Sequence, residues 1–176
     1  MKGKGAKLCL FDRDGVLNVD KAYLYRPGDA EWIPGSREAV AWLNRRGYTV
    51  VVVTNQSGVA RGYYTEEDVH RFHRWMAGEF AKAGGRIDRF YYCPHLKEGT
   101  VAAYAVDCGC RKPKPGMVLA ALRDYGAAPD DCFLVGDSPR DIEAARAAGV
   151  AGYLFPGGNL LDFVKPIAAA RQDKTE

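Results

Sequence analysis

The chain has 176 residues and a formal net charge of +3, from 25 basic and 22 acidic side chains. That length is enough for one compact domain with a substantial core, and the small net charge argues against nucleic acid or a membrane surface as a partner. The sequence has no run of about 18 apolar residues, and the apolar stretch after the basic residues 1–5 is too short for a secretory signal. We therefore expect a cytoplasmic protein, with a monomer as the simplest assembly.

Apolar runs and helix start and stop signals predict that strands and helices alternate along the chain. In chain order, the expected elements are a strand at residues 7–11, a helix at 36–46, a strand at 48–54, a helix at 65–83, a strand at 87–92, a helix at 116–125, a strand at 132–135, a helix at 139–148, a strand at 152–155 and a helix at 159–171. Ser36 is the expected N-cap of the first helix, and Thr65 with Asp68 has the pattern of a capping box at the second. This order predicts a doubly wound α/β fold, with a mainly parallel sheet and helices on both faces.

We expect residues 1–176 to form a single domain without a separate cap domain. The sequence contains no internal repeat and no low-complexity segment, and two long loops, at residues 15–35 and 93–115, are the only insertions between the expected elements. Cys9 and Cys132 lie in apolar runs and are expected to be buried. The total of five cysteines is odd, which argues against a disulfide framework.

Two carboxylates stand at the end of the first expected strand, in the run Phe-Asp12-Arg-Asp14-Gly. Side chains two residues apart on a strand point to the same side, so Asp12 and Asp14 can converge on one small volume. Because two like charges repel at such short range, a cation or a shared proton must offset the repulsion between the two carboxylates. A carboxylate that attacks beside one that moves protons would explain the pair, and a polar turn after a strand is the alternative.

Three further polar segments lie where the expected strands end or the expected helices begin. The run that starts at Thr54 (Thr-Asn-Gln-Ser-Gly) follows a valine-rich strand and offers a hydroxyl and backbone N–H groups to a phosphate. Arg111 and Lys112 are adjacent cations before a helix, suited to an anionic ligand. Asp137 follows the fourth strand and could join Asp12 in holding Mg²⁺ through oxygen ligands. Each segment alone could be a polar turn, but together they describe phosphoryl transfer.

The order of these segments resembles the haloacid dehalogenase superfamily of phosphatases, and the resemblance covers nearly the whole chain. It implies that Asp12 attacks phosphorus to give an aspartyl phosphate, and that Asp14 protonates the leaving alcohol and then activates water. Thr54 and Lys112 would stabilise the phosphoryl oxygens. The resemblance also implies a catalytic Mg²⁺, bound by the side chains of Asp12 and Asp137 and by the backbone carbonyl of Asp14.

A second metal site is predicted in the long loop at residues 93–110. Three cysteines and one histidine, in the order C-x-H then C-x-C, supply the ligands of a tetrahedral structural zinc: Cys93, His95, Cys108 and Cys110. Four protein ligands leave no position for a substrate, so we expect this zinc to clip the loop and to hold Arg111 and Lys112, which follow directly. Free thiols and a surface histidine are the alternative.

Haloacid dehalogenase proteins with such a zinc loop include phosphatases of heptose bisphosphates and of histidinol phosphate. The runs Val53–Gly62 and Tyr91–His95 look most like the heptose group. By this resemblance, the substrate, a small phosphorylated sugar, is bound by Asn18, Asp20, Lys21, Ala22, Tyr23, Thr54, Asn55, Gln56, Ser57, Arg111, Lys112 and Ser138. Within that set, Arg111 would recognise the phosphate that does not react.

Other functions are also compatible with these motifs. Histidinol-phosphate phosphatase keeps the same chemistry, and a non-catalytic module that binds phosphosugars keeps only the fold. A DNA 3′-phosphatase shares some motifs, but the sequence shows no extended basic patch or aromatic platform. His70 and His73 lie three residues apart on an expected helix, and we expect them on a solvated helix face rather than at a metal. The three tryptophans are expected to pack.

Overall fold

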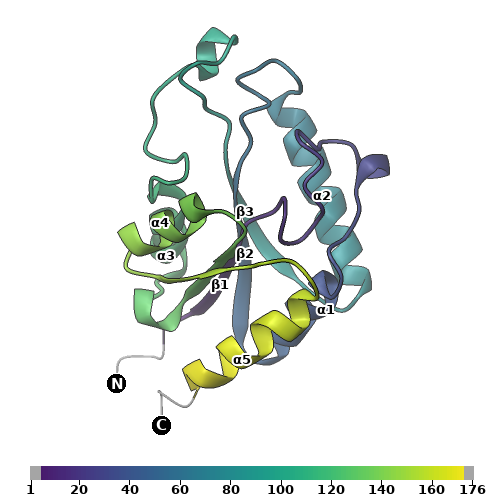
Figure 1. Cartoon of the computed structure of the whole chain (residues 1–176), viewed down its shortest axis with the longest axis vertical. Helices are drawn as coiled ribbons and strands as arrows, with labels where there is room; N and C mark the ends of the chain where they lie inside the picture. Colours follow the sequence, from purple (N-terminus) through teal and green to yellow (C-terminus); the bar gives the residue numbers. More distant parts are fainter. Residues whose placement is uncertain (1–4, 173–176) are drawn as a thin grey trace.

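The structure is a computed structural model that describes residues 5–172 (Figure 1). Its centre is a five-stranded sheet in the order β3-β2-β1-β4-β5, and every pair of neighbouring strands is parallel. The strands are β1 (Lys7–Phe11), β2 (Tyr48–Asn55), β3 (Ile87–Cys93), β4 (Phe133–Gly136) and β5 (Ala151–Leu154). The expected parallel α/β sheet is therefore confirmed. Residues 1–4, within the segment where we expected no secretory signal, lie outside the described range.

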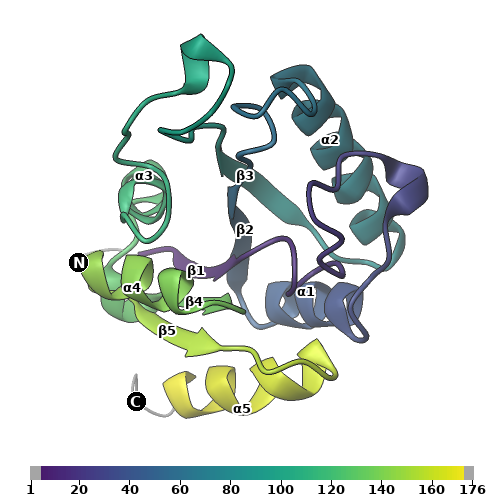
Figure 2. The same cartoon turned by 45° about the horizontal axis from the view of Figure 1, so that its top comes forward.

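Helices cover both faces of the sheet, as the sequence predicts (Figure 2). They are α1 (Ser36–Arg45), α2 (Glu66–Lys82), α3 (Gly116–Tyr125), α4 (Pro139–Ala147) and α5 (Leu160–Gln172). Alternate residues of the central strands enter two cores: Val50 and Val52 pack with α1, α2 and α5, whereas Val51 and Val53 pack with α3 and α4. The valine run of β2 is thus buried on both faces, as in a doubly wound fold.

Each predicted element boundary lies within one residue of its position in the structure, and one predicted cap is wrong. Ser36 is the first residue of α1, and the N-cap is Gly35, with a left-handed φ of 76°. A Cβ at Gly35 would also lie 2.2 Å from Oδ1 of Asn159. Glycine is therefore favoured here both by the left-handed backbone and by the close approach of Asn159. The capping box at Thr65 and Asp68 is confirmed: Asp68 N donates to Thr65 Oγ1 at 3.2 Å, and Thr65 N donates to Asp68 Oδ2 at 2.9 Å.

The topology brings four loops to the carboxyl edge of the sheet, at the top of Figure 1. The chain moves from β1 outward to β3, then returns to place β4 on the other side of β1. Such a reversal opens a crevice at the strand ends, where doubly wound proteins bind ligands. Here Asp12 N, just after β1, donates to the Val135 carbonyl of β4 at 3.0 Å. Across residues 5–172, the helices lack the length and apolar character needed to span a bilayer.

Candidate active site

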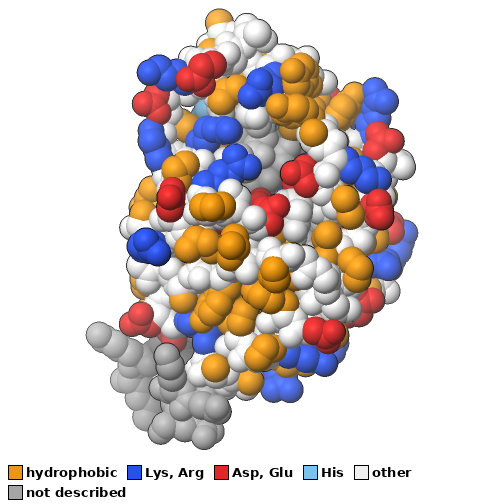
Figure 3. All heavy atoms as spheres, in the orientation of Figure 1, with side chains coloured by type: hydrophobic (Ala, Val, Ile, Leu, Met, Phe, Trp, Pro, Cys, Tyr) orange, Lys and Arg blue, Asp and Glu red, His pale blue; other side chains and the backbone are white. Residues whose placement is uncertain are grey.

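A cavity of about 340 Å³ lies at this crevice, in the hollow in the upper half of the surface in Figure 3. Twelve of the predicted site residues line it: Asp12, Asp14, Asp20, Ala22, Tyr23, Asn55, Gln56, Ser57, Arg111, Lys112, Asp137 and Ser138. Three residues that the sequence did not single out also line it, namely Arg61, Tyr64 and Arg140. The motifs therefore meet in one volume, with both carboxylates and cations on its wall.

Three predicted site residues lie outside the lining of this cavity. Asn18 is fully buried, and its Nδ2 donates to Asp14 Oδ1 at 2.9 Å. Thr54 is buried as well, and its Oγ1 accepts from Gln56 Nε2 at 2.8 Å. Lys21 forms an exposed ion pair with Glu31 at 3.3 Å. Asn18 and Thr54 support residues of the cavity wall, whereas Lys21 contacts another residue of its own loop, at residues 15–35.

A buried charge triad forms the floor of the cavity. Lys112, only 2% exposed, places its Nζ 2.9 Å from Asp12 Oδ1 and 2.6 Å from Asp141 Oδ1. Burial disfavours the charged lysine, but the two carboxylates outweigh it and raise the pKa of Lys112. For Asp12, burial dominates over the opposing Lys112 charge, and Asp141 and Asp14 add to it, which raises the pKa of Asp12 from 3.8 to about 8. A further cation beside Asp12 would favour its ionised form.

The carboxylates of this floor fit a divalent cation. Oxygen atoms of Asp12, Asp137 and Asp141 lie within 4.8 Å of one another. Asp141 already binds Lys112 through Oδ1 and accepts from Ser138 N through Oδ2 at 3.1 Å, so its role is to place Lys112. Burial, with Asp141 nearby, raises the pKa of Asp137. Hard oxygen donors of this kind suit Mg²⁺.

Gly15 is the residue that lets Asp137 approach this floor. Its φ of +88° is left-handed, and a Cβ there would lie 1.9 Å from Asp137 Oδ2. A side chain at this position would therefore be strained and would also displace the carboxylate. The glycine of the predicted motif is explained by both requirements.

Asp14 is held separately from the carboxylates of Asp12, Asp137 and Asp141. Its Oδ1 accepts from Arg13 Nη2 at 3.1 Å and from Asn18 Nδ2 at 2.9 Å, and its Oδ2 accepts from Gln56 Nε2 at 3.1 Å. Gln56 is fixed in turn by Tyr64, whose hydroxyl donates to Gln56 Oε1 at 2.6 Å. The carboxylate lines the cavity in a fixed orientation, as a group that moves protons must.

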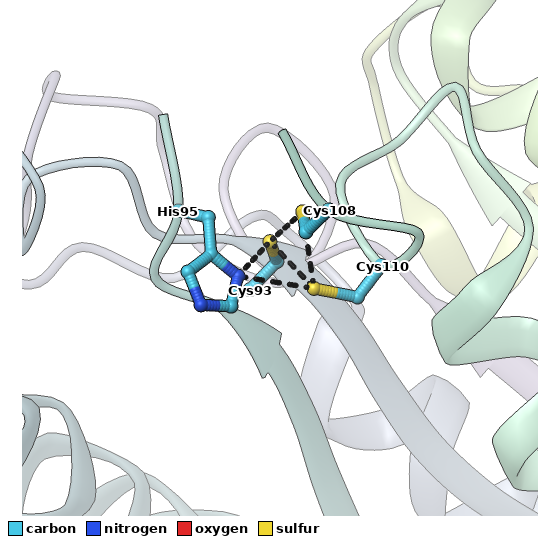
Figure 4. Close-up of side chains that lie close together, drawn as sticks. All are labelled: Cys93, His95, Cys108 and Cys110. Atoms are coloured by element: carbon cyan, nitrogen blue, oxygen red, sulfur yellow. Dashed lines mark hydrogen bonds between the residues drawn. The ribbon is translucent and has the colours of Figure 1, made fainter. Parts of the chain in front are cut away.

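The predicted zinc ligands converge at the end of β3 and in the loop that follows it (Figure 4). Cys110 Sγ lies 2.9 Å from Cys93 Sγ, 3.4 Å from Cys108 Sγ and 3.4 Å from His95 Nδ1. The Cys93 thiol, followed by His95, stabilises the Cys110 thiolate and lowers the pKa of Cys110 to about 5, while the same contact with Cys110 raises the pKa of Cys93. Three sulfurs and one imidazole nitrogen facing one another fit a tetrahedral zinc.

This loop also orients Arg111 toward the cavity. Arg111 N donates to Cys108 Sγ at 3.4 Å, and Arg111 Nη1 donates to the His95 carbonyl at 3.4 Å. The next residue is pinned from the other side, because Lys112 N donates to Asn55 Oδ1 at 3.0 Å. The Cys/His cluster and the charge triad are thereby joined by two consecutive residues.

Several site residues had weak signals in the sequence. Asp141 reads as an acidic residue at a helix start, and only the fold brings it to Lys112. Arg61 belongs to the run after Thr54 that carries the family resemblance, so its position was available, though its role was not. Arg140 lies two residues beyond Ser138 and reads as an exposed cation of α4.

The geometry defines a site for anionic, phosphate-like ligands on a doubly wound fold. The sequence model of the haloacid dehalogenase-like hydrolases matches residues 19–149, and the chain belongs to this family.

Two curated relatives and one solved structure are similar to this chain over most of its length. The chain is 45% identical over 161 residues to the D-glycero-beta-D-manno-heptose-1,7-bisphosphate 7-phosphatase of Rhodopseudomonas palustris, covering 92% of this chain and 89% of the relative. It is 47% identical over 146 residues to the Vibrio cholerae protein of the same name, covering 82% and 78%. The D,D-heptose 1,7-bisphosphate phosphatase of B. bronchiseptica, crystallised with magnesium and phosphate, is similar in structure: TM-score 0.77, 35% identity, and coverage of 96% and 98%.

Proposed function

We propose that the chain is a Mg²⁺-dependent phosphomonoesterase that removes the C7 phosphate of D-glycero-β-D-manno-heptose 1,7-bisphosphate. The observation that carries the proposal is the Asp12 carboxylate, held 2.9 Å from Lys112 Nζ on the floor of a cavity that Asp14 also lines. A nucleophile, an acid/base and a cation in one concave site are the parts that phosphoryl transfer needs. The names of the relatives support the choice of substrate.

In the first step, an Asp12 carboxylate oxygen attacks the phosphorus, and the bond from phosphorus to the C7 oxygen breaks. Asp14 gives its proton to the departing oxygen, so heptose 1-phosphate leaves as an alcohol and Asp12 carries the phosphoryl group. Lys112 balances the charge on the phosphoryl oxygens. General acid catalysis of this kind contributes roughly 10²–10⁴-fold in rate.

In the second step, water attacks the phosphorus and gives its proton to the Asp14 carboxylate. The bond from phosphorus to the Asp12 oxygen breaks, which releases inorganic phosphate and restores both aspartates. Thr54, through its contact with Gln56, keeps the wall beside Asp14 in place. The two steps use the same cavity and leave the protein unchanged.

The side chains of Asp12 and Asp137 and the backbone carbonyl of Asp14 would hold Mg²⁺. When bound, the ion supplies charge neutralisation between Asp12 and an incoming phosphate, two anions that would otherwise repel. Structural Zn²⁺ would be held by Cys93, His95, Cys108 and Cys110. Its thiolate ligands close the loop that carries Arg111 and Lys112.

A substrate with two phosphates suits the charge of the cavity. Beyond the triad, Arg61, Arg111 and Arg140 line the wall, and Arg111 would bind the phosphate at C1 that does not react. A planar guanidinium matches a phosphate through paired N–H donors. Asp20, Ala22, Tyr23, Asn55, Gln56, Ser57 and Ser138 would contact the sugar, and Asn18 and Lys21 would support the loop below it.

We also propose the assembly, the cellular location and the pathway of the protein. A single domain of residues 1–176, with the zinc loop at 93–110, would act as a monomer in the cytoplasm. The heptose product would supply lipopolysaccharide synthesis. None of the five cysteines forms a disulfide, which supports a reducing compartment.

Phosphate release with Mg²⁺ from the β-heptose 1,7-bisphosphate, its α anomer and histidinol phosphate, measured side by side, tests the proposal. We expect the β-heptose substrate to be preferred over histidinol phosphate by ~100-fold in kcat/KM, about 2.7 kcal/mol in transition-state binding. The reverse preference would move the chain to histidinol-phosphate chemistry. Binding of the bisphosphate without phosphate release would instead support the non-catalytic reading.

A further inference from the structure

Arg13, which separates the two catalytic aspartates, is buried. Its side chain is 1% exposed and heads the largest fully buried side chains among the described residues. A buried guanidinium stays charged, so its placement is costly unless its N–H groups have partners. Neither the motif nor the proposed reaction accounts for this residue.

The partners of Arg13 tie it to Asp14. Arg13 Nε and Nη2 donate to Asp14 Oδ1 at 3.3 and 3.1 Å. Nη2 also donates to the Leu24 carbonyl at 2.8 Å, in the loop that lines the cavity. The guanidinium carbon lies 4.7 Å from the Phe72 ring centre, so an aromatic face covers the group.

The remaining contact of Arg13 is with His73 on α2. Arg13 Nη1 lies 3.2 Å from His73 Nε2, and because arginine has only donors, Nε2 must accept. His73 is 5% exposed and stacks on Phe90 with a centroid distance of 4.3 Å. Burial first, and then the Arg13 charge, lower the pKa of His73 well below its usual value, which keeps the imidazole neutral. The expectation that His73 lies on a solvated helix face is therefore wrong.

We propose that Arg13 and His73 are positioning residues for the proton transfers of Asp14. His73 fixes the plane of the guanidinium, and the guanidinium fixes the carboxylate. This inference rests on the proposed function, since it assigns roles within that reaction.

The hydrogen-bond donors around Asp14 are shared unequally between its two carboxylate oxygens. Three N–H groups, from Arg13 and Asn18, converge on Oδ1, whereas Oδ2 accepts one, from Gln56. A carboxylate oxygen has two lone pairs, so Oδ1 is saturated and Oδ2 retains room for a proton. Oδ2 is accordingly the oxygen that gives its proton to the leaving group and takes one from water.

The test compares two leaving groups in single-turnover and burst experiments with the zinc-loaded protein and Mg²⁺. The two substrates are the heptose bisphosphate and p-nitrophenyl phosphate. The C7 alkoxide of the heptose needs a proton to leave, whereas p-nitrophenolate does not. We expect Arg13→Met to slow phosphoryl transfer from the heptose substrate by ~100-fold, with KM within about threefold, in line with the size of general acid catalysis. The p-nitrophenol burst of the same variant should slow by less than about fivefold, because that step does not use the acid.

Substitutions at His73 keep the test decisive if Arg13→Met fails to fold. His73→Leu removes the acceptor, and we expect a ~10-fold loss with the heptose substrate alone, a part of the acid contribution. His73→Gln restores an acceptor oxygen and should recover the rate to within about threefold of the parent protein. Phe80→Leu, two turns along α2 in the same core, is the matched control; it should lower Tm and leave both rates unchanged.

Equal losses with both substrates, or a His73→Gln variant as slow as His73→Leu, would overturn the inference and leave Arg13 a structural residue. A parent protein that releases phosphate from neither substrate would overturn the proposed function instead. The leaving-group comparison thus separates the two failures.

Discussion

Replacing Lys112 by methionine tests the buried charge triad, and the structure sets the magnitude. The substitution keeps an unbranched apolar stem and removes the ammonium that lies 2.9 Å from Asp12 and 2.6 Å from Asp141. Removing one partner of a buried ion pair costs about 3–5 kcal/mol, because the remaining charge stays desolvated. A loss of that size is a large part of the ~5–15 kcal/mol that stabilises a typical domain.

Urea unfolding followed by circular dichroism measures this loss. For Lys112→Met, we predict a free energy of unfolding lower by about 3–5 kcal/mol at pH 8 without Mg²⁺. The loss should be smaller at pH 5, because the pKa of Asp12 is raised to about 8 and this carboxyl then holds a proton. At pH 8 the loss should also be smaller with saturating Mg²⁺ than without it, because the ion replaces part of the missing charge. Phosphate release should be abolished in every condition.

Lys114→Met is the matched control for this prediction. Lys114 lies two residues further along the same loop and pairs with Asp107 at 2.6 Å, but both side chains are about half or more exposed. Exposed pairs contribute little, so this variant should unfold like the parent protein. If Lys112→Met were as stable as Lys114→Met at pH 8, the account of a buried, stabilising triad would be refuted.

Three further predictions concern the metals and pH. Gly15→Ala, whose Cβ would lie 1.9 Å from Asp137 Oδ2, should weaken Mg²⁺ binding by at least ~10-fold in calorimetry, whereas Gly28→Ala, with open space around it, should not; equal affinities would contradict the assignment of Asp137. The purified protein should carry one zinc per chain by metal analysis, and Cys108→Ser should lose it and raise KM; zinc-free protein purified without chelators would contradict the site. Because the pKa of Asp12 is raised from 3.8 to about 8, the folded metal-free protein holds a proton that the unfolded chain has lost, so its stability should fall as pH rises from about 4 to about 8. Mg²⁺ should reverse that fall, and denaturant titrations that show rising stability over this window would contradict it.

Local patterns in the sequence were sufficient for most of the fold. The valines of β2 are buried on both faces of a parallel sheet, and the pattern at Thr65 does form a capping box. Strand ends could be located as well, and parallel strands bring their carboxyl ends to one edge, which placed Asp12, Lys112 and Asp137 together. These features depend on neighbours along the chain or on the topology alone.

Features that depend on side-chain packing could not be predicted. Asp141 looks like a residue that favours a helix start, and its ion pair with Lys112 exists only once α4 packs beside β4. His73 has a neighbour in Arg13 that is 60 residues away in the chain, and no periodicity reports such a contact. Ser36 resembled an N-cap, but the N-cap is Gly35 in a left-handed conformation, and Ser36 is the first residue of α1.

The most direct measurement is phosphate release from β-heptose 1,7-bisphosphate by the parent protein and by Asp12→Asn, with Mg²⁺ and in the same assay. The account predicts that the parent protein releases one phosphate per substrate and yields heptose 1-phosphate. It predicts no turnover for Asp12→Asn, which keeps the fold but lacks the nucleophile. Retained turnover in a folded Asp12→Asn variant would contradict the assignment of Asp12, and a parent protein that releases the C1 phosphate would contradict the proposed substrate orientation.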